Sequence, residues 1–216
     1  MTTRATSLPR LLLLLCLVAS LALCLPAQDS GSARDKWQRP QEVMDALGIA
    51  AGTVVADVGA GNGYFTFHLA ERVGATGRVY AVDISESALK KLRERAEKEK
   101  LAQIETVLGA TDDPRLAPES VDVVLVVNAY HEMRDYDAMM AGFFRALKPG
   151  GRLAIIDGAI EPGQKRDSYF SRHRVPKEVV REEAERAGFV FAREEKGFTR
   201  GHDSRQFYFL VFEKRE

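Results

Sequence analysis

The sequence of 216 residues is long enough for one α/β domain with a short leader, and its 45% hydrophobic residues can fill one buried core. The 31 basic and 31 acidic residues give a formal net charge of zero. This balance excludes the strongly basic surface of most nucleic-acid-binding proteins and the strong acidity of many disordered chains. We therefore expect a folded domain with no nucleic-acid partner.

An apolar leader begins the chain. Arg4 and Arg10 flank its polar start, and residues 11–25 are almost entirely apolar and rich in leucine. A membrane-spanning helix needs about 20 apolar residues, so this shorter run is more typical of a secretory signal peptide. An uncleaved anchor and a lipoprotein signal ending at Cys24 are the alternatives. We expect export to the periplasm or beyond, with membrane contact only through an uncleaved leader.

The leader sets the expected domain organisation. A signal peptide or membrane anchor is predicted over residues 1–27, a small polar linker over 28–36, and the folded domain over 37–216. Both cysteines of the chain, Cys16 and Cys24, lie in the leader. The domain therefore offers no thiol for a disulfide, a nucleophile or a metal ligand. No feature of the sequence predicts an oligomeric state.

Apolar runs alternate with helical patterns along the domain, which is typical of parallel βα units. Strands are predicted at residues 54–58, 79–82, 104–108, 121–127, 152–156, 189–193 and 206–212. Helices are predicted at 40–47, 64–73, 85–100, 136–147 and 176–187, and residues 159–174 are expected to be irregular. The run at 121–127 is the most hydrophobic strand, so we expect it in the middle of the sheet.

A glycine-rich motif, Asp57-Val58-Gly59-Ala60-Gly61-Asn62-Gly63, connects the first predicted strand to a helix. Glycines allow the backbone to turn tightly and to approach a ligand closely. A dinucleotide-binding loop would carry glycine or alanine at the position of Tyr64, and the Asp57 carboxylate would repel a pyrophosphate. An acid at this place suits a ligand that carries an amine.

Asp83 closes the second predicted strand. A carboxylate there can accept hydrogen bonds from the two hydroxyls of a ribose. Alternatively, Asp83 caps the helix that begins near Ser85.

The segment Asn128 to Met133 follows the fourth predicted strand, where open α/β sheets bind their ligands. Histidine is the side chain most often used to accept a proton from a substrate, so His131 is a candidate general base, and Tyr130 is the second candidate catalytic residue. The alternative is that both only line a pocket. The spacing of His131, His173 and His202 resembles no metal-binding motif, so no metal site is predicted.

Together, Asp57 to Gly63, Asp83, the run at 121–127 and Leu147-Lys148-Pro149-Gly150-Gly151 resemble the successive motifs of class I S-adenosylmethionine-dependent methyltransferases, of the small-molecule "type 11" kind. The resemblance covers about residues 40–212. It implies a Rossmann-like α/β fold whose seven-stranded, mostly parallel sheet has the order 3-2-1-4-5-7-6, with an antiparallel last strand and helices on both faces. It also implies S-adenosylmethionine as the cofactor and a small-molecule acceptor.

By the same resemblance, the glycine loop holds the methionine part of the cofactor, Asp57 lies near its amino group, and Asp83 binds the ribose. The implied cofactor-binding residues are Asp57, Gly59, Ala60, Gly61, Gly63, Tyr64, Asp83, Ile84, Asp112 and Asn128.

One position departs from the family pattern. Members often carry an aspartate directly after the glycine that follows the third strand, whereas Ala110 follows Gly109 here. Asp112 either contacts the adenine in its place or is a solvated loop acid, and Ile84 would pack on the ring.

Two other functions remain open from the sequence. The leader is compatible with an exported, non-catalytic cofactor-binding module that has a methyltransferase fold. An NAD-binding reductase would need a dinucleotide glycine pattern and a Tyr–Lys pair at the hydride site, and neither is evident.

Overall fold

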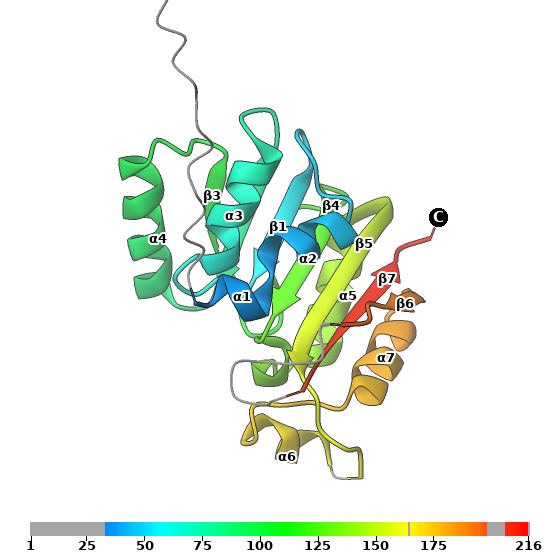
Figure 1. Ribbon diagram of the computed structural model, residues 1–216. Coiled ribbons are helices and arrows are strands. Elements are labelled where there is room, and N and C mark those ends of the chain that lie inside the picture. Colours follow the sequence, from blue (N-terminus) through cyan, green and yellow to red (C-terminus); the bar gives the residue numbers. More distant parts are fainter. Residues whose placement is uncertain (1–32, 164, 198–205, 216) are drawn as a thin grey trace, which may run out of the picture. The chain divides into compact units, whose positions relative to one another are not determined.

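Seven strands form one sheet in the order β3-β2-β1-β4-β5-β7-β6 (Figure 1). The structure is a computed structural model that describes residues 33–163, 165–197 and 206–215. The strands are β1 Val54–Val58, β2 Arg78–Asp83, β3 Ile104–Leu108, β4 Val121–Val127, β5 Leu147–Gly158, β6 Val190–Glu194 and β7 Phe207–Glu213. Strand β7 runs antiparallel to β5 and β6, and the other pairings are parallel. This topology confirms the fold that the family resemblance implied.

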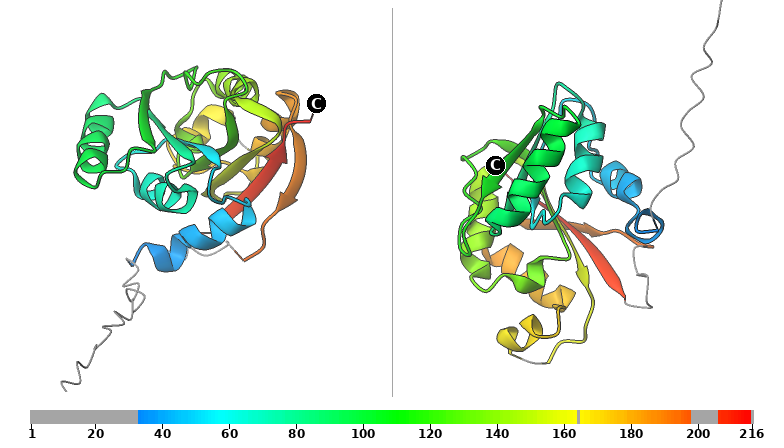
Figure 2. Two further views of the ribbon diagram at one scale, coloured as in Figure 1. Left: turned by 90° about the horizontal axis from the view of Figure 1, so that it is seen from above. Right: turned by 90° about the vertical axis from the view of Figure 1, so that its left-hand side faces the viewer.

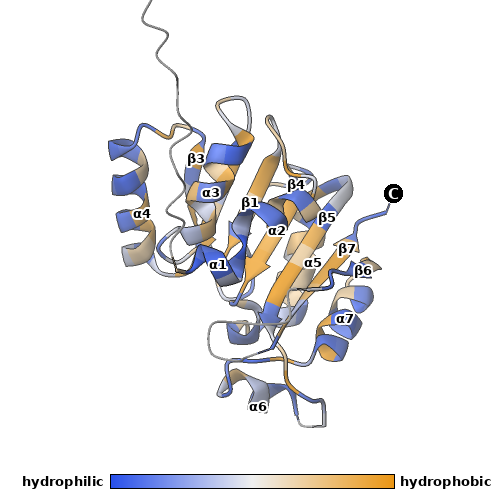
Figure 3. Ribbon diagram, in the orientation of Figure 1, coloured by the Kyte–Doolittle hydropathy of each residue, from blue (hydrophilic) through white to orange (hydrophobic). Residues whose placement is uncertain are grey.

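Helices cover both faces of the sheet (Figure 2). They are α1 Asp35–Gln38, α2 Pro40–Ala46, α3 Tyr64–Val73, α4 Glu86–Lys98, the short 3₁₀ helix η1 Tyr130–Glu132, α5 Tyr136–Ala146, α6 Arg166–Phe170 and α7 Lys177–Arg186. Helices α2, α3 and α4 pack on one face, and α5 and α7 pack on the other. Hydrophobic residues accordingly concentrate in the central strands, and hydrophilic residues on the outer sides of the helices (Figure 3).

Strand β4 is buried on both sides, which explains its uninterrupted apolar sequence. Val123 and Leu125 pack into the core on the side of α2 and α3, while Val124 and Val126 pack into the core on the side of α5 and α7. The carboxyl end of β4 is therefore held rigidly between β1 and β5.

Three local features differ from the sequence-based expectations. Residues 147–151 belong to the start of β5 rather than to a turn, and a register irregularity opposite Val121 and Val123 accommodates them. Helix α6 lies within the region expected to be irregular. Helix α1 begins at Asp35, inside the predicted linker, because Asp35 accepts a hydrogen bond from the hydroxyl of Tyr64 at 2.5 Å.

The predicted leader lies outside the described residues. Within the part of the chain that the structure describes, no helix is both long and apolar enough to cross a membrane.

A buried polar group links α7 to η1 and α6. The carboxylate of Glu183 accepts hydrogen bonds from the hydroxyl of Tyr130 at 2.5 Å and from Nε of Arg166 at 2.8 Å. Only 4% of the Glu183 side chain and 13% of the Arg166 side chain are exposed. Three elements that are distant in the sequence (η1, α6 and α7) thus share one charged centre.

We expect Glu183→Gln to lower the free energy of unfolding by about 3 kcal/mol, because it leaves the Arg166 cation largely buried without its counter-charge. Chemical denaturation measures this change. The matched control is Glu185→Gln on the same helix, which breaks an ion pair with Arg181 whose side chains are 42% and 52% exposed. The control should cost less than about 1 kcal/mol. Equal losses in the two variants would contradict the assignment.

Candidate active site

The glycine loop after β1 lies at the edge of the sheet where the parallel strands end. Its glycines all have positive φ, but they serve different purposes. A Cβ on Gly59 would lie 2.4 Å from Cβ of Ala129, and a Cβ on Gly63 would lie 2.7 Å from the ring of Phe67. At Gly61, no described atom lies within 4 Å of such a Cβ, apart from the neighbouring residues. Packing therefore demands the first and third glycines, while Gly61 keeps an open approach for a ligand.

Asp83 ties this loop to the end of β2. One carboxylate oxygen accepts a hydrogen bond from the backbone N–H of Gly61, and the other accepts one from the N–H of Ser85, both at 2.8 Å. The side chain that caps helix α4 is that of Ser85, whose Oγ accepts a hydrogen bond from the N–H of Ala88. Asp83 thus fixes the geometry of the loop, and its oxygens keep further capacity to accept hydrogen bonds.

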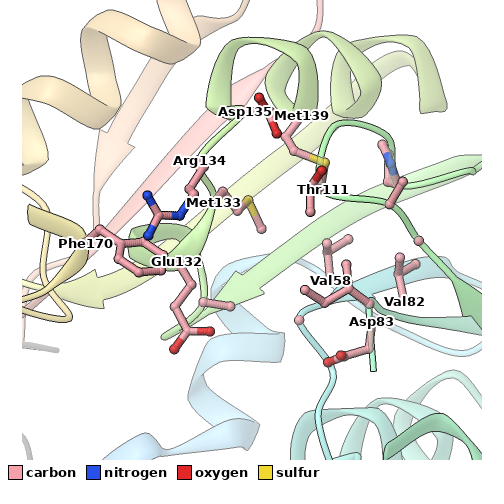
Figure 4. A pocket seen from close by; sticks show the side chains of 16 residues that line it. Val58, Val82, Asp83, Thr111, Glu132, Met133, Arg134, Asp135, Met139 and Phe170 are labelled. Carbon is pink, nitrogen blue, oxygen red and sulfur yellow. The ribbon is translucent and has the colours of Figure 1, made fainter. Parts of the chain in front are cut away.

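A cavity of about 290 Å³ opens beside Asp83 (Figure 4). Asp83 and Val82 lie on one wall, and Phe170 and Glu132 lie on the opposite wall. Met139 of α5 and the loop after β3 contribute to its lining as well. The carboxyl ends of the four strands β1 to β4, together with helices α5 and α6, therefore enclose one mostly apolar cavity.

Three of the expected cofactor-binding residues, Gly59, Asp83 and Ile84, line this cavity. Ile84 is 65% exposed, which is unusual for a large apolar side chain and leaves it available to a flat ring. Asp112 is exposed and lies outside the lining, whereas its neighbours Ala110 and Thr111 belong to it.

The remaining expected residues lie around the cavity rather than in its lining. Ala60 is buried in the loop. The hydroxyl of Tyr64 binds Asp35, and the Arg34 guanidinium lies 3.8 Å from the centre of the Tyr64 ring. Asn128 is exposed with a left-handed φ of 53°.

Asp57 is buried behind the loop and accepts a hydrogen bond from Oγ1 of Thr66 at 2.6 Å. Burial, the largest cause, and the nearby Asp83 carboxylate raise the pKa of Asp57 from 3.8 to about 6. The Thr66 hydrogen bond and the Arg34 cation oppose this rise in pKa only in part. In the ligand-free protein, the Asp57 carboxylate is therefore destabilised, and a cation placed beside it would relieve that cost.

At the end of β4, His131 forms a buried pair with Asp157 of β5. Nδ1 of His131 lies 2.7 Å from the Asp157 carboxylate, which also accepts hydrogen bonds from the backbone N–H groups of His131 and Gly158. Asp157 was not among the site residues predicted from the sequence, although an acid directly after a predicted apolar strand could have indicated it. The carboxylate accepts a hydrogen bond, so Nδ1 of His131 carries the proton that it donates. The lone pair of a neutral His131 is therefore on Nε2.

Nε2 of His131 faces two further polar side chains. The Glu132 carboxylate lies 3.7 Å from Nε2 of His131 and 3.8 Å from Nδ1 of His173. The two imidazole rings are nearly perpendicular, and their centres are 5.4 Å apart. His131 and His173, which are far apart in the sequence, thus lie close together in the structure, while His202 lies outside the described residues.

Tyr130, the second candidate catalytic residue, is fully buried and donates its hydroxyl proton to Glu183 on α7. It is absent from the described residues that line the cavity. In this structure the Tyr130 hydroxyl is engaged by Glu183, and His131 is likewise not among the described residues that line the cavity.

The buried Asp57 predicts a specific pH dependence of stability. Its pKa of about 6 in the folded chain exceeds the ordinary value of 3.8, so the folded state binds this proton more tightly than the unfolded state. The stabilisation is complete below pH 3.8 and is lost as the pH rises through 6, which amounts to about 3 kcal/mol. Denaturation of the wild type and of Asp57→Asn across pH 4–7 isolates this effect, since the other carboxylates are common to both. Parallel stability curves would contradict it.

The chain matches known methyltransferases in sequence and structure. A family model described as a methyltransferase domain matches residues 49–200. A demethylmenaquinone methyltransferase of Listeria welshimeri is 32% identical over 139 residues, which are 62% of this chain and 58% of the relative. A ubiquinone/menaquinone biosynthesis C-methyltransferase of Klebsiella pneumoniae is 30% identical over 145 residues, which are 65% of this chain and 57% of the relative. The chain thus matches somewhat more than half the length of these curated relatives.

The fold is also similar to that of solved methyltransferases. The crystal structure of an S-adenosylmethionine-dependent methyltransferase from Aquifex aeolicus superposes with a TM-score of 0.72 and 23% identity, covering 84% of this chain and 93% of that one. The family model matches most of the chain, and the glycine loop and Asp83 meet at one cavity, so the chain belongs to the methyltransferase domain family.

Proposed function

We propose that this chain is an S-adenosylmethionine-dependent methyltransferase whose acceptor is a small aromatic ring that carries hydroxyl groups, of the quinol class. The observation that carries the proposal is the contact between Glu132, which lines the end of the cavity opposite Asp83, and the buried His131 that Asp157 orients behind it. The names of the quinone-modifying relatives in Listeria and Klebsiella support the same class of acceptor.

The adenosine of the cofactor would lie at the Asp83 end of the cavity. Asp83 offers carboxylate oxygens to the ribose hydroxyls, and the exposed Ile84 offers an apolar surface to the adenine. The methionine part would follow the loop past Gly61, with its ammonium group toward Asp57. An ammonium there would lower the pKa of Asp57 and favour the carboxylate.

The acceptor would then occupy the opposite end, between Met133, Met139 and Phe170. These side chains suit an aromatic ring, because thioethers and aromatic rings both pack favourably against it. Methyl transfer from a sulfonium disperses positive charge in an in-line displacement, so alignment in an apolar cavity supplies much of the acceleration. A hydroxylated ring also has to lose a proton, and the His131–Glu132 group is the proton-accepting group at this end.

Asp83→Ala should weaken binding of S-adenosylmethionine about 5- to 150-fold, because charge-assisted hydrogen bonds to the ribose are lost. Isothermal titration calorimetry measures the change. Asp112→Ala is the control: it removes an exposed acid just outside the lining and should alter the affinity less than about two-fold. An Asp83 variant that binds like the wild type would remove this residue from the cofactor site.

The function itself is tested with S-adenosylmethionine and reduced 1,4-naphthoquinone as the acceptor, with the methylated product detected by mass spectrometry. His131→Ala should lower turnover about 100-fold or more, because the oriented imidazole at the acceptor end is lost. The affinity for S-adenosylmethionine should stay within about two-fold, because His131 lies away from the Asp83 end.

Asp157→Asn separates orientation from packing in the same assay. It keeps the size of the side chain but no longer holds the proton on Nδ1 of His131, so turnover should fall while cofactor binding persists. Methyl transfer to amines or thiols but not to hydroxylated rings would contradict the proposed acceptor class. Equal losses of turnover and cofactor affinity in His131→Ala would show that His131 only supports the structure of the site.

A further inference from the structure

Two histidines and a glutamate from separate elements meet at the acceptor end of the cavity. His131 and Glu132 belong to η1, and His173 follows α6. We propose that His131, Glu132 and His173 bind one divalent transition-metal ion, which holds an oxygen atom of the acceptor.

The three donor atoms lie at distances that suit a shared ion. Nε2 of His131, Nδ1 of His173 and a carboxylate oxygen of Glu132 all lie within 4.8 Å of one another. In a tetrahedral zinc site, ligand atoms about 2.1 Å from the metal are about 3.4 Å apart. The observed separations of 3.7 and 3.8 Å from Glu132 need only small rotations. The side chains of Glu132 and His173 are 60% and 68% exposed, so they have room to make them.

The surroundings of His131 are those of a metal ligand. Metal-binding histidines usually donate their second ring N–H to a carboxylate or carbonyl, which fixes the tautomer and orients the ring. Asp157 is fully buried, accepts this hydrogen bond at 2.7 Å and is itself held by the N–H groups of His131 and Gly158. The Nε2 lone pair of His131 is thereby directed between Glu132 and His173, and only 2% of His131 is exposed.

The backbone around His173 is held by strand β5 and by the end of α6. The N–H of Val175 donates to the carbonyl of Gly158, and the N–H of His173 donates to the carbonyl of Phe170. A Cβ on Gly158 would lie 3.5 Å from the carbonyl oxygen of His173, so the two segments are in close contact. The end of β5 thus positions one ligand through Asp157 and another through Gly158.

The donor set also limits which ion would bind. Two imidazoles and one carboxylate suit Zn²⁺, Co²⁺ or Fe²⁺ better than Mg²⁺ or Ca²⁺, which prefer oxygen ligands. Three protein ligands leave at least one coordination position open, as in catalytic zinc sites. Glu132 lines the cavity, so an oxygen atom of a bound ring could take that position, and the cation would favour its anionic form.

Only the identity of this oxygen ligand rests on the proposed function; the metal site stands on the three side chains and Asp157. In the metal-bound state, Nε2 of His131 is a ligand, and the metal takes over the task of stabilising the deprotonated hydroxyl.

The test is a titration of the tag-free, chelator-treated full chain with Co²⁺ in the absence of cofactor and acceptor. We expect one Co²⁺ per chain, seen as the visible absorption of a low-coordinate Co²⁺ site, and a change in that absorption when catechol is added as an oxygen ligand. Glu132→Gln and His173→Gln each remove one donor at an exposed position, so folding should be preserved, and each should weaken binding at least about 10-fold. Circular dichroism confirms that the variants are folded.

His68→Gln is the matched control. His68 also lies near a carboxylate, with Nε2 3.5 Å from Asp35, but it belongs to α3, outside the proposed site. This variant should bind Co²⁺ like the wild type. Failure of the folded wild type to bind Co²⁺, or wild-type affinity in both Glu132→Gln and His173→Gln, would overturn the metal site. An unchanged absorption with catechol would overturn the open position. None of these results affects the methyl-transfer assay, which is run separately with S-adenosylmethionine.

Discussion

The convergence of the carboxyl ends of β1, β2, β4 and β5 at one edge of the sheet brings the residues of the candidate site together. Parallel strands end at the same edge, so Asp57, Asp83, the segment after Val127 and Asp157 are brought together although they are far apart in the sequence. The double-sided burial of β4 keeps this edge rigid. Asp83 then fixes the position of the loop by accepting the N–H of Gly61. The cavity is thus a product of sheet topology, and the polar side chains only complete it.

Local patterns predicted most of the fold. The bounds of β1, β3 and β4 were predicted correctly because apolar runs flanked by polar residues and glycines leave little freedom there. The start of β5 was missed because Pro149, Gly150 and Gly151 normally end elements, whereas pairing with β4 and β7 carries the strand through them. Helix α1 was missed because it depends on a contact with Tyr64, 29 residues away.

The candidate site was predictable only where the chemistry is contiguous in sequence. The glycine loop and Asp83 form such a motif, whereas the partner of His131 comes from the next strand, 26 residues later, and His173 comes from beyond α6. Nothing in the spacing of these residues indicates that they meet, because β5 and the turn after α6 set their positions. The sequence could not show why each glycine is needed either. A side chain at Gly59 would clash with Ala129, and one at Gly63 would clash with Phe67.

The burial of Asp57 has a consequence for the lifetime of the protein. Near neutral pH, the buried Asp57 carboxylate would be better solvated in the unfolded chain, so its burial lowers the stability of the fold. A cationic ligand beside it would restore this part of the stability. A ligand that binds only the folded state depopulates the unfolded, protease-sensitive chains in proportion to its concentration relative to its Kd. If the proposed methyl donor is the ligand that binds beside Asp57, its supply would also determine how much of the folded protein escapes degradation by proteases.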